Sequence, residues 1–302
     1  MVRLILAALL AMTCAAAAED RAAYLALAEK GWMYELRDRR MRRDIPVHIN
    51  GRDLAGAALC IVGEPPSEDT RAVIAAFGNL AAQVHGKPLP SRYAGPSARA
   101  CGTGRTVVLR LYSGDPPDGA LTRDIARLNE VYGLGLPRGR HYAVLSPGMA
   151  QTFFGRRGTG THIMVQQEGD RPADALARAF YRSILIEELF QAFTFGMDVL
   201  QFDRQGGFLS KLQEVPTDLS RLRWGSPEFM RALLQSNPRG LCAFDLFMMH
   251  AVARAPVDQT NEAGFLDYID SAFDDLAERA RASMADPANA PLLAPECGAG
   301  PG

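Results

Sequence analysis

The 302-residue sequence lacks several patterns that would assign a chemistry directly. No two cysteines are separated by two residues, which argues against a thioredoxin-type redox motif and against a cysteine zinc site. No serine stands in a G-x-S-x-G segment, and no cysteine and histidine are paired by spacing, so a serine or cysteine hydrolase has no support. The glycines Gly155, Gly158 and Gly160 follow no strand-to-helix phosphate motif, so no nucleotide loop is predicted.

Excess charge and long apolar runs are also lacking. The chain has 33 basic and 34 acidic residues and a formal net charge of −1 at pH 7. This balance argues against a general nucleic-acid-binding protein. Beyond the first 18 residues the apolar runs are interrupted by charged residues, so we expect no transmembrane anchor.

The first 18 residues have the composition of an export signal. Arg3 is followed by the apolar run LILAALLAM and then by small residues that end in AAAA before Glu19. This order is typical of a secretory signal peptide, with cleavage near Ala18, and the apolar run is too short to span a membrane. Cys14 is not preceded by the residues of a lipoprotein signal. We therefore expect a periplasmic or secreted protein.

Four cysteines remain after this cleavage, and their even number in an exported chain predicts two disulfides. They are Cys60, Cys101, Cys242 and Cys297. Three pairings are possible. Cys60–Cys101 with Cys242–Cys297 is favoured because each bond joins neighbouring segments of the chain, and free buried thiols are the alternative.

One stretch, Pro172 to Asp198, reads as a single long helix and contains the main candidate site. Its second half is apolar on almost every side, which predicts a buried helix. Within that half, Glu187, Glu188 and Gln191 fall in one sector of about 100°. Adjacent glutamates are costly to bury unless they are paired, protonated, bound to metal or facing a wet cleft. A functional site is therefore predicted here.

The E-E-x-x-Q spacing parallels the H-E-x-x-H helix of zinc peptidases. Glu187 and Gln191 hold the two ligand positions, and Glu188 holds the position of the general base. Both histidines are missing, and a glutamine oxygen is a poor zinc ligand. The alternatives are a pair held by arginine or backbone donors in a cleft, and a site for an oxygen-preferring cation or an organic ligand.

Among the scattered histidines, His162 is the one that we expect beside the glutamates. It lies on a predicted strand, Thr161 to Gln167, and could supply a missing ligand or a proton relay. A hydrogen-bonded strand histidine is the favoured interpretation, and the ligand or relay role is the alternative. A cation site would draw on Glu187, Gln191, Asp198 and His162, with Glu188 as the catalytic residue.

The rest of the chain predicts an α+β protein. Helices are expected at Glu19–Asp44, Thr70–His85, Leu121–Tyr132, Leu241–Arg254 and Asn261–Met284, and strands at Ile45–Asn50, Ala57–Val62, Arg105–Ser113, His141–Leu145 and Thr161–Gln167. The glycines between the last two strands are expected to form a flexible loop. The basic run Arg37–Arg43 could meet anionic lipid or an acidic partner, or could be a solvated helix end.

The E-E-x-x-Q helix and the aspartate that follows it resemble the bacterial exported family called domain of unknown function 2927. The matching residues are Glu187, Glu188, Gln191 and Asp198, and the resemblance covers roughly residues 45–249. It implies a zincin-like fold, a twisted mixed sheet packed on a long central helix, with residues 161–167 as the edge strand. Thr194 stands where a glycine is expected, and Gly196 is expected to make the turn instead.

The local patterns and this resemblance together give the expected organisation of the chain. A signal peptide (1–18) and an N-terminal helix (19–44) precede a zincin-like domain (45–200), a mainly helical C-terminal subdomain (201–286) and a flexible tail (287–302). Three functions follow: a non-peptidase module that binds a protein, peptide or envelope component; a metal-dependent hydrolase with Glu188 as base; and a structural envelope protein. No cofactor is predicted, although the second function requires a divalent cation.

Overall fold

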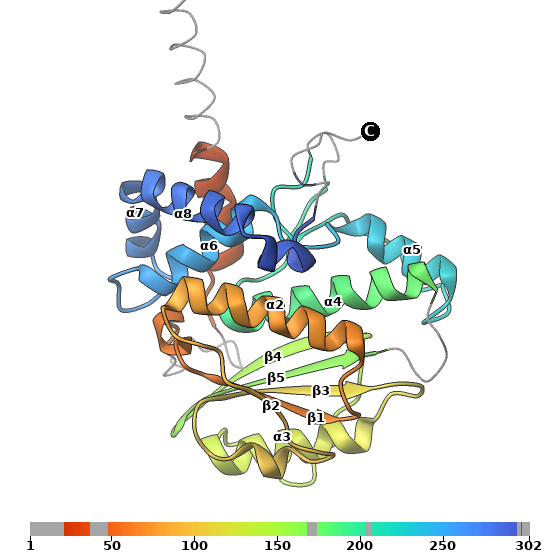
Figure 1. The fold of residues 1–302 in the computed structure, drawn as a ribbon. Helices are drawn as coiled ribbons and strands as arrows, with labels where there is room; N and C mark the ends of the chain where they lie inside the picture. The colour runs from red at the N-terminus through yellow and green to blue at the C-terminus, as the bar shows by residue number, and fades with distance from the viewer. Residues whose placement is uncertain (1–20, 37–47, 168–173, 203–206, 295–296, 298–302) are drawn as a thin grey trace, which may run out of the picture.

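The computed structural model describes residues 21–36, 48–167, 174–202, 207–294 and 297 (Figure 1). The predicted signal peptide, the basic run Arg37–Arg43 and Pro172 lie outside these residues. The elements are η1 (Gly51–Leu54), β1 (Ala58–Gly63), α2 (Glu68–His85), β2 (Ser91–Tyr93), η2 (Ala98–Cys101), β3 (Thr106–Tyr112), α3 (Asp118–Tyr132), β4 (Gly148–Gly155), β5 (Gly158–Gln166), α4 (Ala175–Thr194), β6 (Val199–Leu200), β7 (Gln213–Glu214), α5 (Pro227–Ser236), α6 (Ala243–Arg254), α7 (Ala263–Ser271), α8 (Phe273–Ala285) and η3 (Pro287–Leu292).

A mixed five-stranded sheet in the order β2-β1-β3-β5-β4 forms the middle layer. The first four of these strands run parallel, and β4 is antiparallel to β5. Helices α2 and α4 cover one face of the sheet and α3 covers the other (Figure 1). The prediction of a mixed α and β structure is therefore confirmed.

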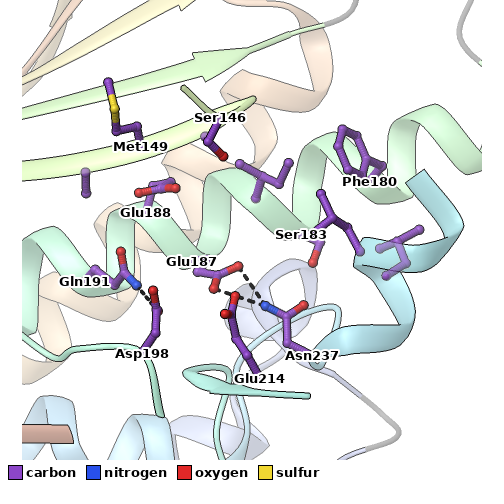
Figure 2. A pocket seen from close by; sticks show the side chains of 15 residues that line it. Ser146, Met149, Phe180, Ser183, Glu187, Glu188, Gln191, Asp198, Glu214 and Asn237 are labelled. Atoms are coloured by element: carbon purple, nitrogen blue, oxygen red, sulfur yellow. Dashed lines mark hydrogen bonds between the residues drawn. The ribbon is translucent and has the colours of Figure 1, made fainter. Parts of the chain in front are cut away.

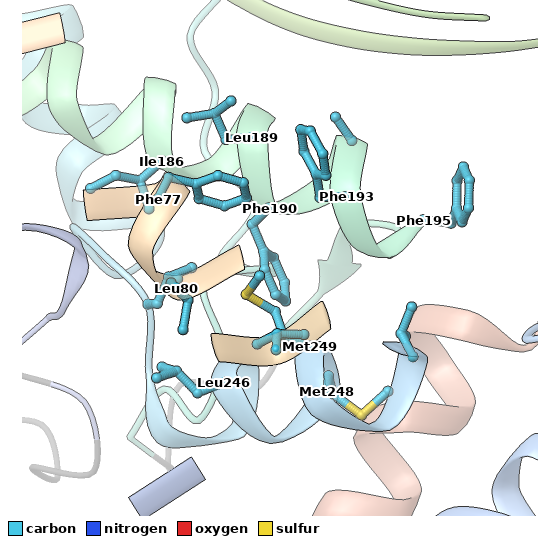
Figure 3. Packing of buried hydrophobic residues seen from close by; sticks show 14 of the residues in the cluster. Phe77, Leu80, Ile186, Leu189, Phe190, Phe193, Phe195, Leu246, Met248 and Met249 are labelled. Atoms are coloured by element: carbon cyan, nitrogen blue, oxygen red, sulfur yellow. The ribbon is translucent and has the colours of Figure 1, made fainter. Parts of the chain in front are cut away.

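The inner strands are apolar on both faces because both faces are covered by helices. Along β1, Leu59 and Ile61 belong to the apolar cluster on the α4 side, whereas Cys60 and Val62 belong to the cluster on the α3 side. This alternation follows from the two-residue period of a strand. The cluster on the α4 side extends through α6, α7 and α8, so the sheet and the C-terminal helices share one core. Figure 3 shows the part of this core in which α2, α4 and α6 meet.

The last two strands of the sheet differ from the prediction. Residues 141–145 are not a strand, and the glycines expected in a flexible loop lie in a β4–β5 hairpin. A Cβ on Gly155 or Gly160 would lie within 2.5 Å of Tyr132, so glycine allows α3 to pack closely against the hairpin. The edge strand beside α4 is β4, because β5 pairs with β3 on one side and with β4 on the other.

The N-terminal segment also departs from the expected long helix. Residues 21–32 are helical, but 33–36 are not. The indole of Trp32 donates to the carbonyl of Thr194 (2.9 Å), and the Tyr34 hydroxyl donates to that of Phe195 (3.0 Å). The segment leaves its helix where these side chains bind the end of α4. Residues 48–50, predicted as strand, instead precede η1, whose first turn is capped by the Asn50 side chain.

The C-terminal part is mainly helical, but it differs from the prediction in three places. The expected helix Asn261–Met284 is broken at Ala272 into α7 and α8, and both halves bury apolar residues in the shared core. Two short strands, β6 and β7, pair in parallel. Residues 287–292 form η3 rather than a loose tail, because buried Asn289 donates to Gln83 (3.0 Å) and to the carbonyl of Ser283 (2.9 Å).

Both disulfides have the pairing favoured from the sequence. Cys60 is bonded to Cys101, and Cys242 is bonded to Cys297, with Cα–Cα distances of 5.6 Å and 5.4 Å. The first bond joins β1 to η2, and the second joins the start of α6 to the C-terminal segment. None of the helices in the described ranges is long and apolar enough to cross a membrane.

Candidate functional site

The polar sector of α4 opens into a cleft of about 320 Å³ (Figure 2). Its walls come from α4, from β4 and nearby Ser146, from the segments around β6 and β7, and from the end of α5. Its polar lining comprises Ser146, Ser183, Glu187, Glu188, Gln191, Asp198, Glu214 and Asn237. The structure thus brings together four of the five predicted site residues, Glu187, Glu188, Gln191 and Asp198.

Helix α4 can approach the edge strand closely because β4 begins with a glycine. A Cβ on Gly148 would lie 2.0 Å from Ile184 Cγ2 and 2.8 Å from Glu188 Oε1. The next residue on that side of the strand, Ala150, donates its backbone amide to the Glu188 carboxyl. Glu188 is therefore held between the helix and the sheet edge.

The turn after α4 directs Asp198 back toward the helix. Phe195, not Gly196, adopts the left-handed conformation (φ 59°), and its amide donates to the Gln191 carbonyl. Gly196 is needed for a different reason, because a Cβ there would lie 2.7 Å from the Trp32 ring. The side-chain amide of Gln191 then donates to Asp198. The expected turn at Gly196 is therefore replaced by one at Phe195.

Strand pairing brings a fourth carboxylate to the cleft. Val199 pairs with Gln213 and Leu200 with Glu214 in a parallel register. Asp198 precedes β6 and Glu214 ends β7, and because side chains alternate along a strand, both project from the same face of this short ladder. The sequence analysis did not select Glu214. No local signal selects it, because residues 212–215 read LQEV and show no alternation of apolar and polar residues that would predict a strand.

Glu187 is held by two polar groups that the sequence analysis also missed. The Asn237 side-chain amide donates to both Glu187 oxygens, at 3.1 and 3.0 Å (Figure 2). Lys211 Nζ lies 3.0 Å from Glu187 Oε2. The Lys211 side chain has no exposed surface, and that of Glu187 is 12% exposed. Glu187 is therefore one member of a nearly buried ion pair.

Lys211 is positioned by the first turn of α6. Asp245 accepts hydrogen bonds from the Ser210 hydroxyl (2.5 Å) and from the backbone amides of Lys211 (2.8 Å) and Cys242 (2.7 Å). The Lys211 ammonium also donates to Ser183 Oγ (3.0 Å) and to a backbone carbonyl, that of Pro238 (2.7 Å). These bonds satisfy the ammonium without water, as a buried cation requires.

The carboxyl groups of the cleft disfavour one another's ionisation. Burial, followed by the charges of Glu187 and Asp198, raises the pKa of Glu188 well above its usual range. Burial and Glu187 raise the pKa of Asp198 to about 6. Burial, Asp198 and Glu187 raise the pKa of Glu214 to about 7. In each case Lys211 opposes the increase, but one ammonium does not balance four carboxylates.

Glu188 differs from Glu187 because one of its carboxyl oxygens, Oε2, has no hydrogen-bond partner among the described residues. Its residue surface is 8% exposed. A buried carboxyl with an unsatisfied oxygen in a cleft is an unfavourable arrangement in the free protein. It is the group of the site that is best able to receive a ligand.

His162 lies away from this cleft. It pairs with Gln151 on β4, one residue from cleft-lining Ala150, so its side chain points to the opposite face of the sheet. There its Nε2 lies 3.0 Å from Oδ2 of Asp124, which also pairs with Arg110. The structure therefore shows the favoured interpretation of His162, a hydrogen-bonded strand histidine, but it does not place this residue beside the glutamates as expected.

Three of the carboxylates could hold a metal ion. Oxygens of Glu187, Asp198 and Glu214 lie within 4.8 Å of one another. Carboxylate oxygens suit hard cations such as Ca²⁺, Mg²⁺ or Mn²⁺ rather than zinc. A cation bound there would compete with Lys211 for Glu187.

Comparison of the chain with protein-family models, with curated proteins and with solved structures finds no match. The features that bear on function are the chemistry of the cleft, the two disulfides and the pattern of the E-E-x-x-Q helix.

Proposed function

We propose that this is a periplasmic or secreted protein whose degenerate zincin-like domain binds a basic side chain of an extended peptide or protein segment without cleaving it. The observation that carries this proposal is the unbalanced acidic cleft, in which Glu188 keeps a buried oxygen without a partner. The resemblance of the E-E-x-x-Q helix to domain of unknown function 2927 supports the zincin-like assignment. The two disulfides support export.

The contacts within the cleft argue against peptidase chemistry. Neither histidine nor cysteine lines it in the described part of the chain. Both oxygens of Glu187 are occupied by Asn237, and one of them also by Lys211; the amide of Gln191 is directed to Asp198. The two positions that carry zinc ligands in H-E-x-x-H helices are therefore engaged in side-chain contacts.

The charge of the cleft favours a cationic ligand. Glu187, Glu188, Asp198 and Glu214 line it, whereas no lysine or arginine lines it in the described part of the chain. Lys211 lies behind the cleft, paired with Glu187. An ammonium or guanidinium group near Glu188 would stabilise the ionised carboxylate and use its free oxygen. Lysine and arginine side chains supply these groups in peptides.

The sheet edge provides a place for the backbone of such a ligand. Strand β4 pairs with β5 on one side, and Gly148 and Ala150 line the cleft on the other. A second depression of about 220 Å³ continues past Thr152 and Phe154 and shares Gln191 and Asp198 with the first. Adding an extended segment to an exposed strand is a common mode of peptide binding.

Titration calorimetry with short extended peptides tests the proposal. A peptide with a central lysine should bind at about pH 8, and the same peptide with a central glutamate should not. A cation favours ionised carboxylates, so affinity should rise as pH increases through the raised pKa values of Asp198 and Glu214, about 6 and 7. We expect at least about tenfold weaker binding at pH 5.5 than at pH 8.

The matched control is Glu228→Gln, which removes an exposed glutamate on α5 outside the cleft. It should bind as the wild type does, whereas Glu188→Gln should lose the lysine peptide. Peptide recovered after incubation should be intact by mass spectrometry. Equal affinity for the lysine and glutamate peptides would contradict the proposal. Equal loss of lysine-peptide binding in Glu188→Gln and Glu228→Gln would also contradict it.

The cluster of Glu187, Asp198 and Glu214 supports a second candidate, a hydrolase that uses a hard divalent cation and Glu188 as general base. Chelator treatment should leave the melting temperature unchanged if the first proposal holds. Stoichiometric binding of Ca²⁺, Mg²⁺ or Mn²⁺ in equilibrium dialysis, with peptide cleavage that Glu188→Gln abolishes, would favour the second candidate instead.

A further inference from the structure

A separate cavity of about 390 Å³ lies against the face of α4 opposite the acidic cleft. It is distinct from the depression that adjoins the cleft. Arg178, Arg182 and Ile186 line it from α4, and at about 100° per residue they point away from Glu187 and its neighbours. Arg239 and Leu293 complete it from the C-terminal part of the chain. Its charge is opposite to that of the cleft.

Positive charge is concentrated in this cavity. Among the residues that the structure describes, three arginines line it, Arg178, Arg182 and Arg239, together with one acidic residue, Asp69. Arg178 and Arg182 are one helical turn apart, a spacing at which like charges repel. The cavity also lies at the first turns of two long helices, α2 and α4, where the helix dipoles add positive potential.

The walls of the cavity are fixed by bonds that do not involve a ligand. Arg182 Nη2 donates to the Pro291 carbonyl at 3.0 Å. The Leu241 amide donates to the Leu292 carbonyl (2.7 Å), and the Ala294 amide donates to the Leu241 carbonyl (3.0 Å). The disulfide at Cys242 lies next to this pairing. A cavity fixed in this way loses little conformational entropy when a ligand binds.

We propose that this cavity binds a phosphate monoester. Guanidinium groups bind phosphate oxygens in pairs, and three of them against one carboxylate match a dianion better than a monocarboxylate. The apolar side chains of Ile186 and Leu293 provide contact for the carbon atoms next to the phosphate. The phosphate can belong to a soluble molecule or to a lipid headgroup. This proposal is independent of the acidic cleft.

Titration with glycerol phosphate at constant ionic strength, which keeps charge screening constant, tests the site. Wild type should show saturable binding, and Arg178→Gln and Arg239→Gln should each weaken it at least about tenfold. Arg231→Gln on α5 removes the same charge outside the cavity and should leave binding unchanged. Arg182 is left in place because of its bond to Pro291, and melting curves confirm that the variants fold.

Flotation with vesicles identifies the source of the phosphate. Capture by phosphatidic acid vesicles but not by phosphatidylcholine vesicles, lost in Arg178→Gln, supports the site and assigns it a headgroup. Binding of glycerol phosphate alone supports the site with a soluble ligand. Absence of both, or equal binding by Arg178→Gln and Arg231→Gln, would overturn the proposal.

Discussion

Replacing Lys211 with methionine is expected to destabilise the protein by about 3–5 kcal/mol, the typical cost of breaking a buried ion pair. The ammonium has no solvent-exposed surface and contacts Glu187, Ser183 and the Pro238 carbonyl. Methionine fills a similar volume but leaves Glu187 without its cation in a cleft with three further carboxylates. The measurement is the free energy of urea unfolding at pH 7.

The control for this substitution is Lys87→Met, which removes the same charge from an exposed loop position. It should change stability by no more than about 0.5 kcal/mol. In a double-mutant cycle, Lys211→Met combined with Glu187→Gln should cost less than the sum of the two single changes. If Lys211→Met lowers the free energy of unfolding by less than about 1 kcal/mol, the Lys211–Glu187 pair does not stabilise the site.

The second large effect is a contrast between the adjacent glutamates. Glu187→Gln should destabilise the protein by about 3 kcal/mol or more, because it leaves buried Lys211 without its anionic partner. Glu188→Gln should leave stability within about 0.5 kcal/mol of wild type or raise it, since functional groups are often retained at a cost in stability. Both variants are compared with wild type by urea unfolding at pH 7.

The reason for the contrast is the protonation of Glu188. Burial and the neighbouring carboxylates raise its pKa well above the usual range and so favour its uncharged form, and glutamine has nearly the same shape as a protonated glutamate. A raised pKa in the folded state means that ionisation opposes folding, so wild type should lose stability relative to Glu188→Gln as pH increases. Equal destabilisation by the two substitutions would make Glu188 a structural residue.

Local sequence patterns predicted much of the fold. Helical periodicity predicted α2 and α3 and most of α4 and α6, and β-branched runs predicted β1 and β3. Patterns failed where tertiary contacts decide the backbone. The tip of the β4–β5 hairpin is rich in glycine because Tyr132 packs against it, and a glycine-rich segment alone reads as a loop. The N-terminal helix ends early because Trp32 and Tyr34 bind the end of α4.

Local patterns likewise predicted only the part of the candidate site that lies on one helix. The spacing of Glu187, Glu188 and Gln191 depends on the period of a single helix, and that period places all three in one cleft. Lys211 and Asn237 reach the cleft from distant segments, so no local pattern selects them. His162 was placed wrongly because the strand order, which decides the edge strand, is a property of the whole sheet.

The central claim is that Glu188 is the unpaired acid of the cleft and the group that receives a cation. Carbon-13 NMR of labelled glutamate carboxyls tests it most directly, with the Glu188 signal assigned from its absence in Glu188→Gln. The account predicts that this carboxyl titrates well above the usual glutamate range in the free protein and that the lysine peptide shifts its titration to lower pH. A Glu188 carboxyl that titrates as an exposed glutamate does and ignores the peptide would contradict it.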